Sequence, residues 1–191
     1  MTQHLGRMRS LLFAFIVCTL WIQPTLAQVR VFLTEREAIQ HALGDAERIR
    51  TVGVKVDADA IARVERASGV PFRIGWTHCY QGSTGGNVIA YACIDNMIGK
   101  ERPITYIARI NHPQGTIGMI EVMEYREAIG GEVNSQAFRE QFEGKSTNDP
   151  LMLQEDIRNL NGATLSSRGL TNGARKLLHF YATVLRDLPA F

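Results

Sequence analysis

Three hydroxyl side chains crowd one short stretch near the C-terminal end of the chain. Residues 159–167 read NLNGATLSS, an Asn-Gly turn signal followed by Thr164, Ser166 and Ser167. An amphipathic helical pattern begins in this stretch and continues to Leu185. One hydroxyl is enough to cap a helix, so the others suggest a second role.

A phosphate group is a natural ligand for the start of such a helix. The first backbone N–H groups have no partner within the helix, which carries about half a positive charge at this end. Gly162 and Ala163 are small enough to let a bulky group approach the backbone. Thr164 and Ser166 could cap the helix, hydrogen-bond a phosphate or be esterified by one, and the residues alone leave these roles open.

The stretch NGATLSSRGLTNGARKLL resembles the flavin-attachment segment of the FMN-binding domain family, in which Ser/Thr-Gly-Ala-Thr-x-Ser/Thr precedes a helix. Upstream, GTIGMIEVMEYREAIGGEV and AFREQFEGK resemble the family's hairpin strand, acidic Gly-rich loop and following helix. DNMIGKERPITYIARI fits the strand before them, so the resemblance covers about residues 85–185. Related domains occur in Rnf-type and Na+-translocating NADH:quinone reductase complexes and in NosR-like regulators.

The resemblance implies FMN as cofactor, joined through its phosphate to Thr164 by a separate, Mg-dependent flavin transferase. It also implies that Glu127 and Gly131, in the acidic Gly-rich loop, face the flavin. The implied cofactor-binding residues are Asn161, Gly162, Ala163, Thr164, Leu165, Ser166, Glu127 and Gly131.

Two residues depart from the family pattern. Asn161 stands where the family has Ser or Thr, and Arg158 stands where an Asp is frequent, although Asp156 is close by. Asn161 still offers hydrogen bonds and tolerates a turn conformation. Covalent FMN on Thr164, non-covalent FMN and a flavin-free domain therefore remain alternatives.

The first 27 residues have the pattern of a signal peptide. Arg7 and Arg9 precede the apolar run LLFAFIVCTLWI, and Ala27 is a plausible cleavage point. The run is shorter than the roughly 18 residues of a membrane-spanning helix. We expect a periplasmic or otherwise exported protein, and the alternative, an uncleaved anchor, would make it membrane-associated.

Charge and composition exclude several classes of function. Without the first 27 residues the chain has 19 basic and 19 acidic residues, and no basic run is interleaved with aromatics, so no nucleic-acid partner is expected. The five His are scattered singly and no metal-binding Cys motif occurs, so no metal site is expected. No nucleophile with an acid or base nearby in sequence is evident, which favours an electron-carrier domain over a stand-alone enzyme.

The pattern of the chain predicts one α+β domain after the signal peptide. Helices are expected at 32–44, where Thr34 and Glu37 form a capping-box signature, and at 57–69. Alternating apolar residues predict four strands, and turn signals predict helices between them and the C-terminus. The strands are expected at 72–80, 87–95, 104–110 and 115–125, and the helices at 134–145, 148–153 and from about 164 to 185.

Short connections favour an antiparallel β-meander or half-barrel packed with helices, the last of which is long. The predicted organisation is a signal peptide (1–27), an N-terminal helical segment (28–71) and an FMN-binding domain (72–191). If the Gly-rich turn centres on Gly86, Cys79 and Cys93 lie opposite each other. They would then form a cross-strand disulfide or remain two buried thiols.

The sequence therefore predicts an exported FMN-binding electron-transfer protein. It would pass electrons between membrane-associated or periplasmic redox partners, with FMN supplying the redox chemistry. The alternative is a flavin-free binding or regulatory module with the same fold.

Overall fold

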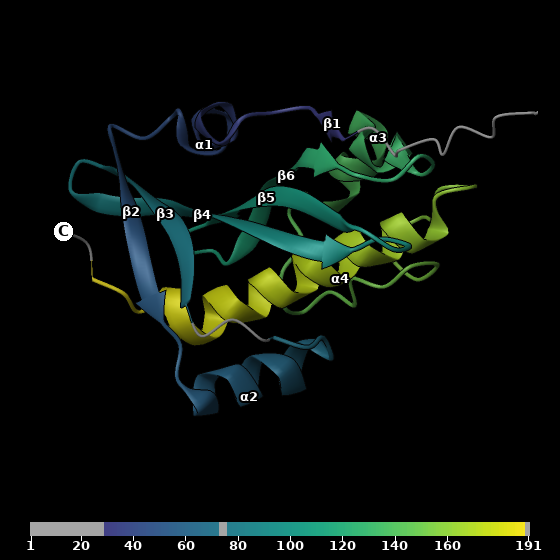
Figure 1. The fold of residues 1–191 in the computed structure, drawn as a ribbon. Helices are drawn as coiled ribbons and strands as arrows, with labels where there is room; N and C mark the ends of the chain where they lie inside the picture. Colours follow the sequence, from purple (N-terminus) through teal and green to yellow (C-terminus); the bar gives the residue numbers. More distant parts are fainter. Residues whose placement is uncertain (1–28, 73–75, 190–191) are drawn as a thin grey trace, which may run out of the picture.

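A six-stranded antiparallel sheet forms the centre of the molecule in a computed structural model that describes residues 29–72 and 76–189 (Figure 1). The predicted signal peptide lies outside the described residues. The strand order is β1-β6-β5-β4-β3-β2. The strands are β1 (Arg30–Val31), β2 (Arg48–Lys55), β3 (Trp76–Thr84), β4 (Asn87–Ile98), β5 (Pro103–Asn111) and β6 (Thr116–Tyr125).

Helices cover both faces of this sheet (Figure 1). On one face, α1 (Glu35–Leu43) buries Ala38, Ala42 and Leu43 against β4, β5 and β6. On the other face, the long helix α4 (Thr164–Phe180) and α2 (Ala58–Ser68) enclose the larger core. Among the described residues, no helix is both long and apolar enough to cross a membrane.

The antiparallel meander predicted from the sequence is confirmed for β3 to β6, which pair with their neighbours in chain order. The N-terminal helices are confirmed as well. Thr34 and Glu37 form both bonds of a capping box at α1, and Asp57 caps α2, which ends at the left-handed Gly69.

The N-terminal segment, predicted to be helical, also contributes two strands that the sequence pattern did not reveal. β1 pairs with β6 and β2 pairs with β3, so the segment lengthens the sheet at both edges. The sequence of β2, RIRTVGVK, is mostly exposed and interrupted by Gly53, which hides the alternation that identifies a strand. The domain boundaries stay predictions.

Two predicted helices differ in the structure. Residues 148–153 form no helix, because Asp149 accepts hydrogen bonds from the backbone N–H and hydroxyl of Ser146 and so closes a turn. Residues 134–145 form only short pieces, η1 (Gly131–Asn134), α3 (Gln136–Arg139) and η2 (Glu140–Phe142). Phe138 and Phe142 are buried in the core and contact each other.

Cys79 and Cys93 are joined by a disulfide across β3 and β4. The two residues are direct partners, as the sequence suggested, but the turn does not centre on Gly86. Gly85 and Gly86 form a two-residue turn, and a bulge between Gly82 and Ser83 restores the register of the Cys pair.

The last helix crosses the sheet in close contact with β4 and β5. A Cβ at Gly169 would lie 2.6 Å from the carbonyl oxygen of Ile98, and one at Gly173 would lie 2.5 Å from the Tyr106 hydroxyl. Beyond Phe180 the helix continues as a π-helical turn, η3 (Tyr181–Leu185), so it reaches the predicted end at Leu185. These glycines therefore allow α4 to lie close to β4 and β5.

Candidate functional site

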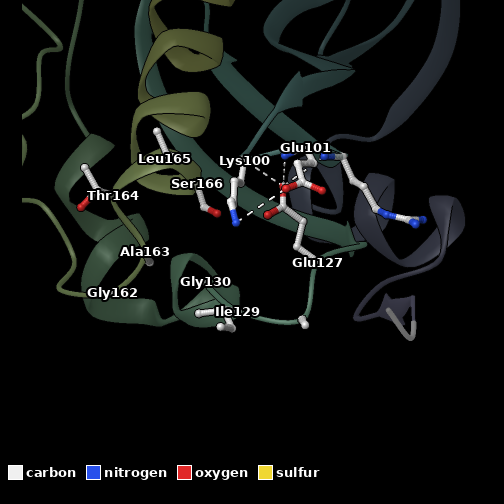
Figure 2. A pocket seen from close by; sticks show the side chains of 12 residues that line it. Lys100, Glu101, Glu127, Ile129, Gly130, Gly162, Ala163, Thr164, Leu165 and Ser166 are labelled. Carbon is white, nitrogen blue, oxygen red and sulfur yellow. Dashed lines mark hydrogen bonds and ion pairs between the residues drawn. The ribbon is translucent and has the colours of Figure 1, made fainter. Parts of the chain in front are cut away.

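A cavity of about 610 Å³ opens where three segments meet (Figure 2). They are the turn between β4 and β5 at residues 99–102, the loop at 126–130 that follows β6, and the first turn of α4. Segments far apart in the sequence therefore build one site. The residues that line it are Lys100, Glu101, Arg102, Glu127, Ala128, Ile129, Gly130, Gly162, Ala163, Thr164, Leu165 and Ser166.

Glu127 ties the loop after β6 to the turn between β4 and β5. Its Oε1 atom accepts hydrogen bonds from the consecutive backbone N–H groups of Lys100, Glu101 and Arg102, at 2.6, 3.0 and 3.1 Å. Successive N–H groups of this kind form a concave anion-binding site, which the carboxylate fills here. Glu127 thus holds one wall of the cavity in place.

Ser166 forms a second link across the cavity. It is 3% exposed, and its Oγ lies 2.8 Å from the hydroxyl of Tyr125 at the end of β6. The Tyr125 hydroxyl also contacts the carbonyl oxygen of Ile129 at 2.5 Å. Burial raises the pKa of Tyr125, although Ser166 acts in the opposite direction, so the phenol is neutral at ordinary pH.

Thr164 differs from Ser166 because it is exposed. Its Oγ1 accepts a hydrogen bond from Nδ2 of Asn159 at 2.9 Å. In Figure 2 the Thr164 side chain points away from Lys100 and Glu127. Thr164 also lines a smaller cavity of about 290 Å³, together with Asn159 and Arg168. Thr164, the first residue of α4, therefore lines both cavities.

The structure contradicts the expectation that one of the clustered hydroxyls caps this helix. Neither Ser166 nor Ser167 caps α4, because the N-cap residue is Ala163 and no side chain makes a capping bond. Ser167 is buried, and its Oγ has no hydrogen-bond partner among the described residues. The first N–H groups of α4 are thus left without a side-chain acceptor, which suits an anionic group beside Thr164.

Six of the eight predicted site residues line the larger cavity. Asn161 and Gly131 do not line it: Asn161 is exposed before the helix, and Gly131 opens η1 close to Arg30. Sequence reasoning missed Asn159 and Tyr125. The Tyr125–Ser166 pair joins residues 41 positions apart, and no local pattern signals such a contact. Among the described residues, no cluster of His, Cys, Asp and Glu could hold a metal ion.

The fold is an α+β domain in which a cavity with hydrogen-bonding walls adjoins the uncapped start of a long helix. Residues 99–179 match the model of the FMN-binding domain family, so this part of the chain is an FMN-binding domain. FMN is its cofactor. The residues fit this molecule, because an exposed hydroxyl at an uncapped helix start adjoins a cavity with hydrogen-bonding walls.

One curated relative and two solved structures are similar to this chain. A component of the ion-translocating oxidoreductase complex of Methanosarcina acetivorans is 25% identical over 164 residues, which cover 82% of this chain and 81% of the relative. NqrC of Shewanella oneidensis shares the fold, with a TM-score of 0.50 at 13% identity over 72% of this chain and 82% of that one. A component of the Na+-translocating NADH-quinone reductase of Parabacteroides distasonis gives a TM-score of 0.48 at 17% identity, over 72% and 77% of the two chains.

Proposed function

We propose that this protein is an exported electron carrier whose FMN is bound through its phosphate to Thr164. The observation that carries the proposal is the exposed hydroxyl of Thr164, at the uncapped start of α4 and at the edge of the cavity. FMN supplies the redox chemistry, and the chain binds and orients it and sets its surroundings.

The contacts of the two candidate hydroxyls favour Thr164 over Ser166. A transferase must reach the oxygen that it modifies, and Ser166 is buried against Tyr125. Attachment forms a bond between Thr164 Oγ1 and the phosphorus of an FMN phosphoanhydride. The P–O bond to the leaving nucleotide breaks, and the hydroxyl proton passes to the transferase. Oxidation states do not change in this step.

The relatives support a class of redox partner for this chain. The curated relative belongs to an ion-translocating oxidoreductase complex, so we infer that this chain exchanges electrons with membrane-associated or periplasmic redox proteins. The apolar run after Arg9 supports export, or anchoring if it is not cleaved. We infer no stand-alone catalytic activity.

Flavin fluorescence on a denaturing gel tests the attachment. The full chain is co-expressed with a Mg-dependent flavin transferase, and we expect a fluorescent band and an intact mass raised by one FMN. Thr164→Ala should remove at least nine tenths of that signal, while the matched control Ser166→Ala should keep it. A band lost in Ser166→Ala but kept in Thr164→Ala would refute the attachment site, and a folded wild-type protein without flavin would favour the flavin-free module.

A further inference from the structure

We propose that the smaller cavity beside α4 is a binding site for a small organic acid, separate from the larger cavity. Arg175 and Arg168 bind the carboxylate of this ligand, and Asn159 accepts a hydrogen bond from a donor group at its other end. The proposal goes beyond the proposed function, because neither FMN nor its attachment to Thr164 enters the argument.

The smaller cavity lies along one face of α4. It has a volume of about 290 Å³. Its lining residues on the helix, spaced so that they share one face, are Thr164, Arg168, Thr171, Asn172 and Arg175. The opposite wall consists of Met152, Leu153, Gln154 and Asn159. At the ~30 Å³ that one water molecule occupies, the cavity accommodates a ligand of about ten non-hydrogen atoms.

Arg175 brings a half-buried positive charge to this cavity without a carboxylate bound to it. Its Nε, Nη1 and Nη2 atoms donate to Ser68 O, Leu151 O and Asn172 Oδ1 at 2.7, 2.8 and 3.1 Å. All three acceptors are neutral. Because a guanidinium has five N–H groups, one N–H on each terminal nitrogen remains for a ligand. A carboxylate is the ligand that two such groups bind best.

The charge that faces the cavity is positive. Arg168 lines it, is exposed, and forms no hydrogen bond or ion pair with another described residue. No Asp or Glu of the described residues lines it. Burial lowers the pKa of Arg175 and Asp156 opposes this effect, but the Asp156 carboxylate is already bound by Lys145 and by two backbone N–H groups. A ligand carboxylate is therefore attracted by both arginines and meets no lining acid.

Asn159 determines the chemistry at the other end of the cavity. Its Nδ2 donates to Thr164, while its Oδ1 is buried without a hydrogen-bond partner among the described residues. A buried acceptor is costly when it is unpaired, so the ligand that suits this end carries a hydroxyl or an N–H group. Met152 and Leu153 also line the cavity and favour a ligand with an apolar body.

The wall opposite α4 has an unusual backbone. Leu151 and Gln154 have φ angles of 46° and 67°, a left-handed region that is unfavourable for residues other than Gly. Such conformations persist only where the surroundings hold them, and they are frequent at binding sites. Arg175 holds this wall, because it binds the Leu151 carbonyl oxygen. The same side chain thus shapes the cavity and charges it.

The position of Arg175 separates this site from a phosphate at Thr164. The guanidinium is held at Asn172, which lies about 12 Å beyond Thr164 at a rise of ~1.5 Å per residue. A phosphate attached to Thr164 Oγ1 stays next to that hydroxyl and is too far away to bind the remaining N–H groups of Arg175. These groups therefore serve a different ligand.

Calorimetric titration of the flavin-free full chain, expressed without a transferase, tests the site. The probe is para-hydroxybenzoate, which has the expected size, a carboxylate, an apolar ring and a hydroxyl at the far end. We expect saturable binding of one probe molecule per chain. Benzoate, which lacks the hydroxyl, should bind several-fold more weakly. Para-hydroxybenzyl alcohol, which lacks the charge, should show no saturable binding.

Variants assign the binding to the cavity. Arg175→Lys keeps the charge but loses the paired N–H groups and should weaken binding about tenfold, with thermal unfolding as the check on the fold. Arg168→Gln, at an exposed position, should weaken it about threefold. Asn159→Leu should abolish the preference for para-hydroxybenzoate over benzoate. The matched control Arg158→Gln changes an exposed arginine outside both cavities and should bind as wild type does.

No saturable binding to the wild type overturns the proposal, as does equal affinity of the wild type and both variants of the lining arginines. The flavin-loaded chain then tests whether the sites are separate, and we expect its affinity for the probe to lie within about threefold of the flavin-free value. Loss of binding on loading would show that the flavin occupies this cavity, which overturns the separate site and leaves the proposed function intact. A chain that takes up no flavin fails the proposed function, while the flavin-free titration still decides this proposal.

Discussion

At the scale of single residues, the environment of Thr164 separates it from its neighbours. Asn159 donates a hydrogen bond to Thr164 Oγ1, and the Oδ1 atom of the same amide is buried without a partner among the described residues. A buried acceptor that is left unpaired is costly, so its retention indicates a role. We infer that Asn159 orients the Thr164 hydroxyl, to which we propose that the phosphate is attached.

Replacing Asn159 by Leu should therefore slow flavin attachment. We expect the flavin-bearing fraction after a fixed co-expression time to fall several-fold, because the Thr164 side chain loses the contact that fixes its rotamer. Intact mass gives the fraction, and thermal unfolding checks that the fold is retained. Asn161→Ser, which restores the family's hydroxyl at an exposed position, is the control and should load at least as well as wild type. Equal loading of Asn159→Leu and wild type would remove Asn159 from this role.

At the scale of elements, a buried ion pair joins α4 to the sheet. Lys176 Nζ lies 2.7 Å from Asp95 Oδ2, and both side chains are about 5% exposed. The Tyr106 hydroxyl donates to the same carboxylate oxygen at 2.9 Å. Charges this deep are tolerated only when they are paired and hydrogen-bonded, so the pair resists any shift of α4 along β4.

Breaking this pair should be strongly destabilising. Lys176→Met leaves the Asp95 carboxylate buried without its cation, and we expect the free energy of unfolding to fall by about 3–5 kcal/mol. Urea denaturation measures it. The double variant Asp95→Asn with Lys176→Met removes both charges and should recover part of the loss. A single variant as stable as wild type would show that the pair does not hold the helix.

Some of the helices and strands could be predicted from the sequence, and others could not. The helix from Thr164 and the four central strands follow local periodicity, and both were predicted. Strand β2 was missed because pairing with β3, rather than its own apolar pattern, makes it a strand. The contact of Ser166 with Tyr125 was missed for a similar reason, since Tyr125 lies on another element.

At the scale of the whole molecule, packing of the C-terminal helix partly buries two His whose pKa values link folding to pH. Burial lowers the pKa of His112, and Arg186 lowers it further. Burial likewise lowers the pKa of His179, with Arg175 adding to the effect. The unfolded chain therefore binds protons at these sites more readily than the folded one, so stability must fall as the pH drops.

We expect the loss of stability in acid to occur in two stages. The first begins near the unfolded His value, about pH 6.5, and continues through the lower folded values of His112 and His179. The second begins below about pH 4, because Arg109 lowers the pKa of Asp45 and the Ser146 backbone lowers that of Asp149. Each depressed group contributes stability above its unfolded pKa and loses it as the pH falls through the folded value.

Urea midpoints between pH 8 and pH 3 check both stages. The variant with His112→Gln and His179→Gln should lose the first decline and keep the second, because Gln does not titrate while the carboxylates remain. Covalently held FMN should change the overall level of stability more than the positions of the two declines, since neither His lines the larger cavity. A first decline that persists in the double variant would assign it to another group and refute the link between sheet packing and these two imidazoles.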